Sequence, residues 1–117
     1  MAPAQLKAFW DSTGALWMKK SLVGKMAGLF VSTGSLHGGQ ETTGLTFVTQ
    51  LAHQGIIFVP FGYVHPGMTK NDEVHGGSPY GCGTIAGIGG SIMPTALELE
   101  MAECQVSHFT RKSPILI

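Results

Sequence analysis

The chain has 117 residues, of which 44% are hydrophobic and 12% charged, and its seven basic residues balance its seven acidic ones. This composition argues against a nucleic-acid binder, which needs clustered basic residues, and against a disordered tail. No apolar run reaches the roughly 18 to 20 residues of a membrane helix, so we expect no integral membrane segment. The two cysteines form no disulfide framework. We therefore expect a cytoplasmic protein with one domain at most.

The first predicted element is an amphipathic helix that begins almost at residue 1. Pro3 suits a first helical turn, where its missing N–H costs nothing, and Gly14 interrupts the pattern near its end. Trp17 lies beyond Gly14, so it fits an interface anchor as well as a core position. The residues that recur at helical spacing are Leu6, Phe9, Trp10, Thr13 and Trp17.

A strand, a glycine-rich loop, a second helix and a second strand follow. Residues 26–31 are apolar on both faces, which is typical of a central parallel strand, and they run into a loop over residues 32–39. The second helix is predicted over residues 41–54, and the second strand over residues 56–59, where Pro60 ends it. We expect the buried stripe of this helix to be formed by Leu45, Val48, Leu51 and Ala52.

The segment from Gly62 to Pro94 shows no helical or strand periodicity and is rich in glycine. Loops of this length are uncommon in compact domains and are usually functional. Because the segment carries apolar side chains and few charges, we expect an ordered, non-helical loop folded over the ligand-binding end of the domain. Cys82 lies between two glycines, which fits an exposed position. A capping box at Thr95 and Glu98 then predicts a final helix that runs to about His108.

These elements predict part of an α/β domain. Two parallel strands joined by a helix form one crossover unit, but two strands do not make a sheet that stands alone. Both strands are apolar on both faces, so they require neighbouring strands.

The loop over residues 32–39 is the strongest candidate binding site on pattern alone. Glycine-rich turns between a strand and a helix bind ligands in open α/β sheets, because free backbone N–H groups and the helix dipole favour anions and carbonyl-type oxygens. Ser32, Thr33 and Ser35 add hydroxyl groups. An ordinary strand–helix connection explains the pattern equally well, and a small-anion-binding module is a further alternative.

The five histidines predict no metal site. No pair has the HExxH spacing, and neither cysteine belongs to a CxxC motif. His53 falls at the end of the second predicted helix, where the helix dipole favours a protonated ring. It is therefore either a residue that helps to end the helix or a ring close to a ligand.

Five segments together carry a more specific signal than any single motif. They are residues 1–17, the run Ser32-Thr33-Gly34-Ser35 that leads into His37-Gly38-Gly39-Gln40-Glu41, the run Leu51-Ala52-His53, residues 76–81 and residues 84–87. In this order, and over nearly the whole chain, they resemble the WrbA family of flavodoxin-like NAD(P)H:quinone oxidoreductases.

The resemblance implies the fold and the reaction. The fold would be α/β, a single partial domain over residues 1–117 that forms the C-terminal part of a flavodoxin-like doubly wound parallel sheet, without its N-terminal strands. The strand over residues 26–31 would then present an unpaired edge. The cofactor would be FMN, with NAD(P)H as co-substrate, a quinone as substrate and a homotetramer as the assembly. The reaction would be a two-step hydride transfer, from NAD(P)H to FMN and then to the quinone.

The resemblance also assigns roles to individual residues. His53 matches a histidine that lines the flavin and substrate cavity, and it is the candidate catalytic residue. Trp17 matches a substrate-binding tryptophan contributed by a neighbouring subunit. The cofactor-binding loop beside the flavin ring would be formed by Ser32, Thr33, Gly34, Ser35, Leu36 and His37, together with His53. We expect Trp17 and His53 to lie at the same end of the strands as this loop.

Several departures from the family support an alternative function. The family's FMN phosphate loop has no counterpart in the chain, Gln54 replaces the second histidine of a pair, and residues 88–93 replace a more polar stretch. The tail after Lys112 is unlike a family helix end. The alternative is a truncated, non-catalytic relative, a binding or oligomerisation fragment that cannot retain FMN.

Overall fold

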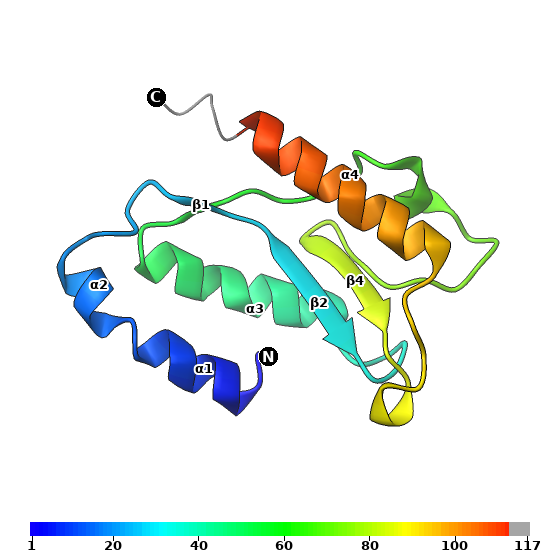
Figure 1. The fold of residues 1–117 in the computed structure, drawn as a ribbon, viewed down its shortest axis with the longest axis horizontal. Coiled ribbons are helices and arrows are strands. Elements are labelled where there is room, and N and C mark those ends of the chain that lie inside the picture. The colour runs from blue at the N-terminus through cyan, green and yellow to red at the C-terminus, as the bar shows by residue number, and fades with distance from the viewer. Residues whose placement is uncertain (113–117) are drawn as a thin grey trace.

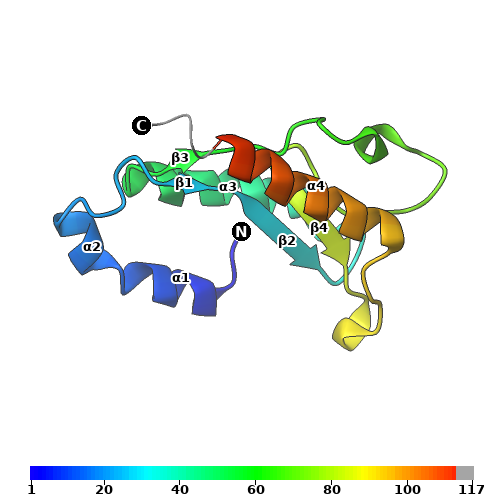
Figure 2. The ribbon, with the colours of Figure 1, turned by 45° about the horizontal axis from the view of Figure 1, so that its top comes forward.

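In the computed structural model, which describes residues 1–112, helices cover both faces of a short set of parallel strands (Figure 1). α3 (Gln40–His53) and α1 (Ala4–Asp11) lie on one face, and α4 (Ala96–Lys112) crosses the other, as the turned view also shows (Figure 2). The α/β class is therefore confirmed. The tail after Lys112 lies outside the described residues.

The strand expected over residues 26–31 is one extended run that changes its partner at Gly28. β1 (Met26–Ala27) pairs with β3 (Ile57–Phe58), and β2 (Leu29–Thr33) pairs with β4 (Gly81–Ile85). Both pairings are parallel, so the expected β–α–β unit is confirmed. β3 and β4 thus pair, one after the other, along the same edge of this single extended run.

β4 is the element that the sequence did not reveal. It lies in the segment expected to lack regular structure, and so do two short 3-10 helices, η1 (Pro66–Thr69) and η2 (Ile88–Gly90). The segment is ordered, as expected, but the prediction of no strand in it is wrong. β4 shows no alternation of buried and exposed residues, and Gly81 and Gly83 occupy two of its five positions, so its sequence carries no strand signal.

The backbones of β2 and β4 approach so closely that Gly81 cannot be replaced without a shift. A Cβ atom at this residue would overlap the carbonyl oxygen of Leu29. We expect Gly81→Ala to lower the free energy of unfolding by about 1 to 3 kcal/mol, as overpacking does in cores. Urea denaturation measures this change in a complete domain of the same fold into which the chain has been grafted. The matched control is Gly14→Ala, where nothing lies within 4 Å, and a loss of similar size there would contradict the explanation.

The N-terminal helix is broken in two and only lightly attached. α1 ends at Asp11, and α2 (Gly14–Met18) begins at the glycine that was expected to lie near the helix end. Neither helix contains a buried residue. This N-terminal segment contacts α3 through the amino group of Met1, 3.0 Å from Thr43 Oγ1, and through the Trp10 ring, 5.2 Å from Phe47 between centroids. Gln54, the residue after α3, donates through Nε2 to Thr13 Oγ1 at 2.8 Å.

The hydrophobic core lies beneath α4. Its buried members are Phe61, Cys82, Leu97 and Met101, and Met68, Ala102 and Cys104 pack against them. The exposed position expected for Cys82 is therefore wrong. The stripe expected on α3 is only partly correct, since Leu51 is buried while Leu45 and Ala52 are exposed.

The capping box at the start of α4 is confirmed. Glu98 N–H donates to Thr95 Oγ1 at 3.2 Å, and Thr95 N–H donates to Glu98 Oε2 at 2.9 Å. These two bonds satisfy backbone donors that the first helical turn leaves free. α4 continues to Lys112, beyond the expected end near His108.

Candidate functional site

The predicted cofactor loop lies at the carboxyl end of β2. Ser32 and Thr33 are the last residues of the strand, and residues 34–37 form an exposed turn before α3. Thr33 Oγ1 donates to the carbonyl of Ser35 at 2.9 Å. A Cβ atom at Gly38 would lie 2.5 Å from Cβ of Thr33, so only glycine lets the turn close this tightly.

The turn presents a row of backbone donors. Within residues 1–112, the N–H groups of residues 34–37 donate no hydrogen bond to another protein group. They precede α3, whose N-terminal end adds the positive end of a helix dipole. This arrangement suits the electron-rich edge of a ligand.

A hollow of about 350 Å³ lies beside the turn, between it and the loop before β4. Two buried or half-buried side chains hold consecutive amides of that loop. Glu98 Oε1 accepts from Gly76 N–H at 2.8 Å, and Gln40 Oε1 accepts from Gly77 N–H at 2.7 Å. The hollow is lined by Leu36, His37, Gly39, Gln40, Glu41, Thr42, His75, Gly76, Gly77 and Ile85.

The same two side chains join three elements. Gln40 Nε2 donates to Thr33 Oγ1 at 3.0 Å and to the carbonyl of Thr84 at 2.7 Å, so it connects α3 to β2 and β4. Glu98 Oε2 accepts from Thr84 Oγ1 at 2.8 Å. The sequence indicated only the capping role of Glu98 and gave no specific signal for Gln40.

Glu98 is only 5% exposed, yet it is held as a carboxylate. Burial alone would raise its pKa, but hydrogen bonds from Gly76, Thr95 and Thr84 and the charge of nearby His75 lower it, and the net pKa lies below the ordinary value. The ionised form is therefore the one that organises the loop.

Trp17 and His53 meet at the other end of the sheet. They line a hollow of about 320 Å³ with Met18, Lys20, Val23, Ala52, Gln54 and Gly55. Trp17 is 57% exposed, and His53, the last residue of α3, is also exposed. Gln54 anchors this end through Thr13, while its Oε1 atom is buried with no partner in the described part of the chain.

The expectation that these two residues share an end with the cofactor loop is wrong. α3 begins beside the loop and returns antiparallel to β2, so its last residue lies at the amino end of the strands (Figure 1). A helix of 14 residues spans about 21 Å. Within one chain, the structure therefore brings Trp17 to His53 but separates both from residues 32–37.

The other candidate groups show no reactive arrangement. Burial, and then the neighbouring Cys104, raise the pKa of the Cys82 thiol from 9.0 to about 12, so it is not a thiolate near neutral pH. Over residues 1–112, no three His, Cys, Asp or Glu side chains are grouped as metal ligands would be. In the same range, every helix is too short or too polar to span a bilayer.

No family model matches the chain. It is, however, 58% identical to the NAD(P)H quinone oxidoreductase PST1 of Candida albicans over 92% of this chain and 54% of that protein. It is also 58% identical to a probable NAD(P)H dehydrogenase (quinone), FQR1-like 2, of Arabidopsis thaliana, over 90% of this chain and 38% of that protein. The quinone-oxidoreductase QR2 of Triphysaria versicolor is 54% identical, over 87% of this chain and 50% of that protein.

The chain thus spans about half the length of the Candida and Triphysaria relatives that it matches. Its parallel strands and flanking helices fit the C-terminal part of a flavodoxin-like fold. These identities confirm the resemblance to the WrbA-type, flavodoxin-like family: the chain matches the C-terminal part of proteins that are named NAD(P)H quinone oxidoreductases.

Proposed function

We propose that these residues form part of an FMN-dependent NAD(P)H:quinone oxidoreductase that works as a homotetramer in the cytoplasm. The proposal rests on the names of the relatives and on one observation. The residues that match the family's site form two groups, one at each end of the sheet. The free thiols of Cys82 and Cys104 support the reducing compartment.

The loop after β2 fits the polar edge of a flavin ring. The free N–H groups of residues 34–37 match acceptor atoms, and the hydroxyl group of Ser32 is exposed beside them. Gly34 leaves room for a flat ring, since a Cβ there would meet only the carbonyl oxygen of Gly87, at 3.6 Å. When bound, FMN would supply the two-electron chemistry that no side chain of the chain provides.

The protein's own residues would bind and orient the reactants. The backbone donors of residues 34–37 would hold the ring, while Gln40 and Glu98 keep the loop at Gly76 and Gly77 in place. Trp17 would form a flat wall against a planar quinone, and His53 would donate a hydrogen bond, or a proton, to a quinone oxygen.

A complete site requires a second copy. Because α3 separates His53 from the cofactor loop by its whole length, the loop of one copy must meet the Trp17 and His53 end of another. Closed assemblies with two-fold axes allow such a meeting at every site. This requirement supports the homotetramer.

Mixing two inactive variants tests both the activity and the shared site. The protein for this test is a chimera in which this chain replaces the matching part of the Candida albicans relative. His53→Ala disables one end, and Gly34→Asp disables the other because its carboxylate would occupy the free backbone donors. We expect the unaltered chimera to purify with flavin absorbance and to oxidise NAD(P)H with a quinone, and each variant to be inactive.

Co-expression of the two variants should restore about a quarter of the activity, because a quarter of randomly assembled sites combine two intact ends. His108→Ala, on α4, is the matched control and should keep full activity. A folded chimera without flavin or activity would contradict the proposed reaction. An active chimera whose mixed variants recover nothing would contradict the shared site alone.

A further inference from the structure

Three consecutive residues line one side of the hollow that Trp17 and His53 share. His53 ends α3, and Gln54 and Gly55 follow it directly. We propose that Gln54 is a positioning residue: its side-chain amide holds the segment that carries Trp17 and so fixes the indole ring relative to the ring of His53. The inference rests on the proposed function, in which Trp17 and His53 form the quinone site. Gln54 itself touches neither the quinone nor the cofactor.

A directed chain of hydrogen bonds runs from Gln54 to the residue before α2. Gln54 Nε2 donates to Thr13 Oγ1 at 2.8 Å, and Thr13 Oγ1 donates in turn to the Trp10 carbonyl at 2.6 Å. Because its proton is engaged by the Trp10 carbonyl, the Thr13 hydroxyl is the acceptor of the first bond. The bond therefore requires a donor at residue 54, which neither a carboxylate nor an apolar side chain supplies.

The backbone of Thr13 transmits this position to Trp17. Thr13 directly precedes α2, and its carbonyl accepts from Leu16 N–H at 2.9 Å and from Trp17 N–H at 3.2 Å. At the other end of this short helix, Lys20 N–H donates to the Trp17 carbonyl at 3.0 Å. Both backbone groups of Trp17 are thus bound to residues of α2 or its flanks, so the direction of the indole follows the position of Thr13.

Gly55 supplies a second attachment on the far side of α2. Its carbonyl accepts from Gly24 N–H at 2.9 Å, and a Cβ atom at Gly55 would lie 2.9 Å from Cγ2 of Val23. The segment from Thr13 to Gly24 is therefore attached at both ends to the two residues that follow His53. Because α2 contains no buried residue, packing in the core does not hold this segment, and the two hydrogen bonds do.

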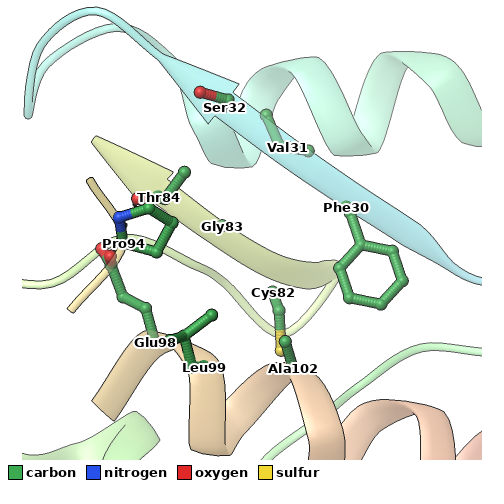
Figure 3. A pocket seen from close by; sticks show the side chains of 10 residues that line it. All are labelled: Phe30, Val31, Ser32, Cys82, Gly83, Thr84, Pro94, Glu98, Leu99 and Ala102. Carbon is green, nitrogen blue, oxygen red and sulfur yellow. Dashed lines mark hydrogen bonds between the residues drawn. The ribbon is translucent and has the colours of Figure 1, made fainter. Parts of the chain in front are cut away.

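The hollow between β2 and α4 has walls of a different kind. Its volume is about 270 Å³, and apolar side chains such as Phe30, Leu99 and Ala102 line it (Figure 3). The attraction between apolar groups is non-directional, so such walls set no angle between rings. At Trp17, the directed hydrogen bonds of Gln54 and Gly55 set that angle.

Gln54 also carries a cost that a residue selected for stability alone would avoid. The residue is 7% exposed, and its Oε1 atom has no hydrogen-bond partner among residues 1–112. A buried acceptor without a partner is destabilising, whereas an apolar side chain of the same shape is often neutral or stabilising. Leucine would therefore suit the fold at least as well. What glutamine adds is the donor Nε2, which supports a role in the geometry of the site.

Kinetics of the chimera with the Candida albicans relative provide the first test. Gln54→Leu removes the donor, Thr13→Val removes the acceptor, and Gln50→Leu, one turn earlier on α3, is the matched control. We expect each of the first two to lower kcat/KM for the quinone about 10-fold, because small displacements of a positioning group are costly. The urea midpoint of Gln54→Leu should stay unchanged or rise, which a merely structural role would not allow. Gln50→Leu should keep the kcat/KM of the unaltered chimera.

Combining the two substitutions separates a shared hydrogen bond from two independent defects. If Gln54 acts through Thr13, the double variant should lose about 10-fold in kcat/KM, as each single variant does, and not about 100-fold. Additive losses would overturn the proposal. So would a Gln54→Leu chimera that keeps its full kcat/KM.

A measurement that needs no activity follows Trp17 directly. The chimera is labelled with 5-fluorotryptophan, and the Trp17 fluorine resonance is identified from its absence in Trp17→Phe. This resonance should shift and narrow in Gln54→Leu and in Thr13→Val, because the indole gains freedom, and should stay in place in Gln50→Leu. An unchanged resonance in Gln54→Leu would overturn the positioning role. An inactive chimera would contradict the proposed function instead, and the fluorine spectrum would still decide the role of Gln54.

Discussion

Expressed alone, the 117-residue chain is expected to aggregate, to retain no FMN and to reduce no quinone. Among residues 1–112, the buried hydrophobic cluster contains four side chains, and large apolar residues such as Phe30, Leu45 and Leu99 remain exposed. Complete domains are themselves only marginally stable, so a chain that buries so few apolar side chains has a net free energy of unfolding close to zero. Over residues 1–112, the side of β1 and β2 that faces away from β3 and β4 pairs with no strand, which adds a template for aggregation.

Loss of FMN follows from the donors that the cofactor's phosphate would lack. In the family that the chain resembles, the phosphate loop belongs to the part without a counterpart here. Each charge-assisted hydrogen bond contributes about 1.5 to 3 kcal/mol, so the loss of several weakens binding by many powers of ten. Solubility, flavin absorbance and quinone-dependent NAD(P)H oxidation measure the outcome. A folded, yellow and active 117-residue protein would refute the prediction.

Replacing Glu98 is expected to be the most damaging single change in the polar network. In the chimera, Glu98→Ala leaves the N–H groups of Gly76 and Thr95 without their acceptor and removes the partner of Thr84. A buried unsatisfied donor costs about 1 to 3 kcal/mol. We expect the free energy of unfolding to fall by about 3 to 5 kcal/mol, measured by urea denaturation. Glu100→Ala, on the exposed side of α4, should change it by less than about 0.5 kcal/mol.

The acid dependence of stability gives a second measurement on the same residue. The pKa of Glu98 is lower in the folded protein than its ordinary value of 4.5. Its stabilising effect is therefore complete above pH 4.5 and is lost as the pH falls through the lower, folded-state value. Glu98→Gln should flatten this part of the stability curve. An unchanged acid dependence would show that the carboxylate is not the group responsible.

The sequence predicts those elements of the fold whose signals are local. The capping box of Thr95 and Glu98 depends on two side chains three residues apart, and the parallel pair of β1 and β3 follows from two apolar runs joined by one helix. The strand over residues 26–31 belongs to the same class, because apolar residues on both of its faces are visible in a few consecutive positions.

The features that escaped prediction depend on contacts between distant segments. β4 is recognisable only beside β2, where its glycines permit the close approach. Gln105, 4% exposed, accepts from Cys82 N–H at 2.7 Å and donates to the Leu29 carbonyl at 2.9 Å. Its amide thus bridges the two strands, which no spacing along the chain indicates.

The position of His53 was misjudged for a different reason. Its role was inferred from a resemblance that matches residues without regard to the copy that carries them. The direction of α3 was already implied by the β–α–β order, and it places the last residue of the helix at the amino end of the strands. Combining these two inferences would have predicted that His53 and the loop over residues 32–37 lie at opposite ends of the strands.

The change of partner at Gly28 has a consequence for the order of folding. Met26 pairs with Ile57, whereas Leu29 pairs with Gly81, so the second pairing closes a much longer loop. The entropic cost of closing a loop rises with the length of the loop, so strands that are far apart in the sequence pair more slowly. β1, α3 and β3 should therefore assemble first as a unit. β4 then joins, and α4 completes the structure when Gln105 inserts its amide between the two strands.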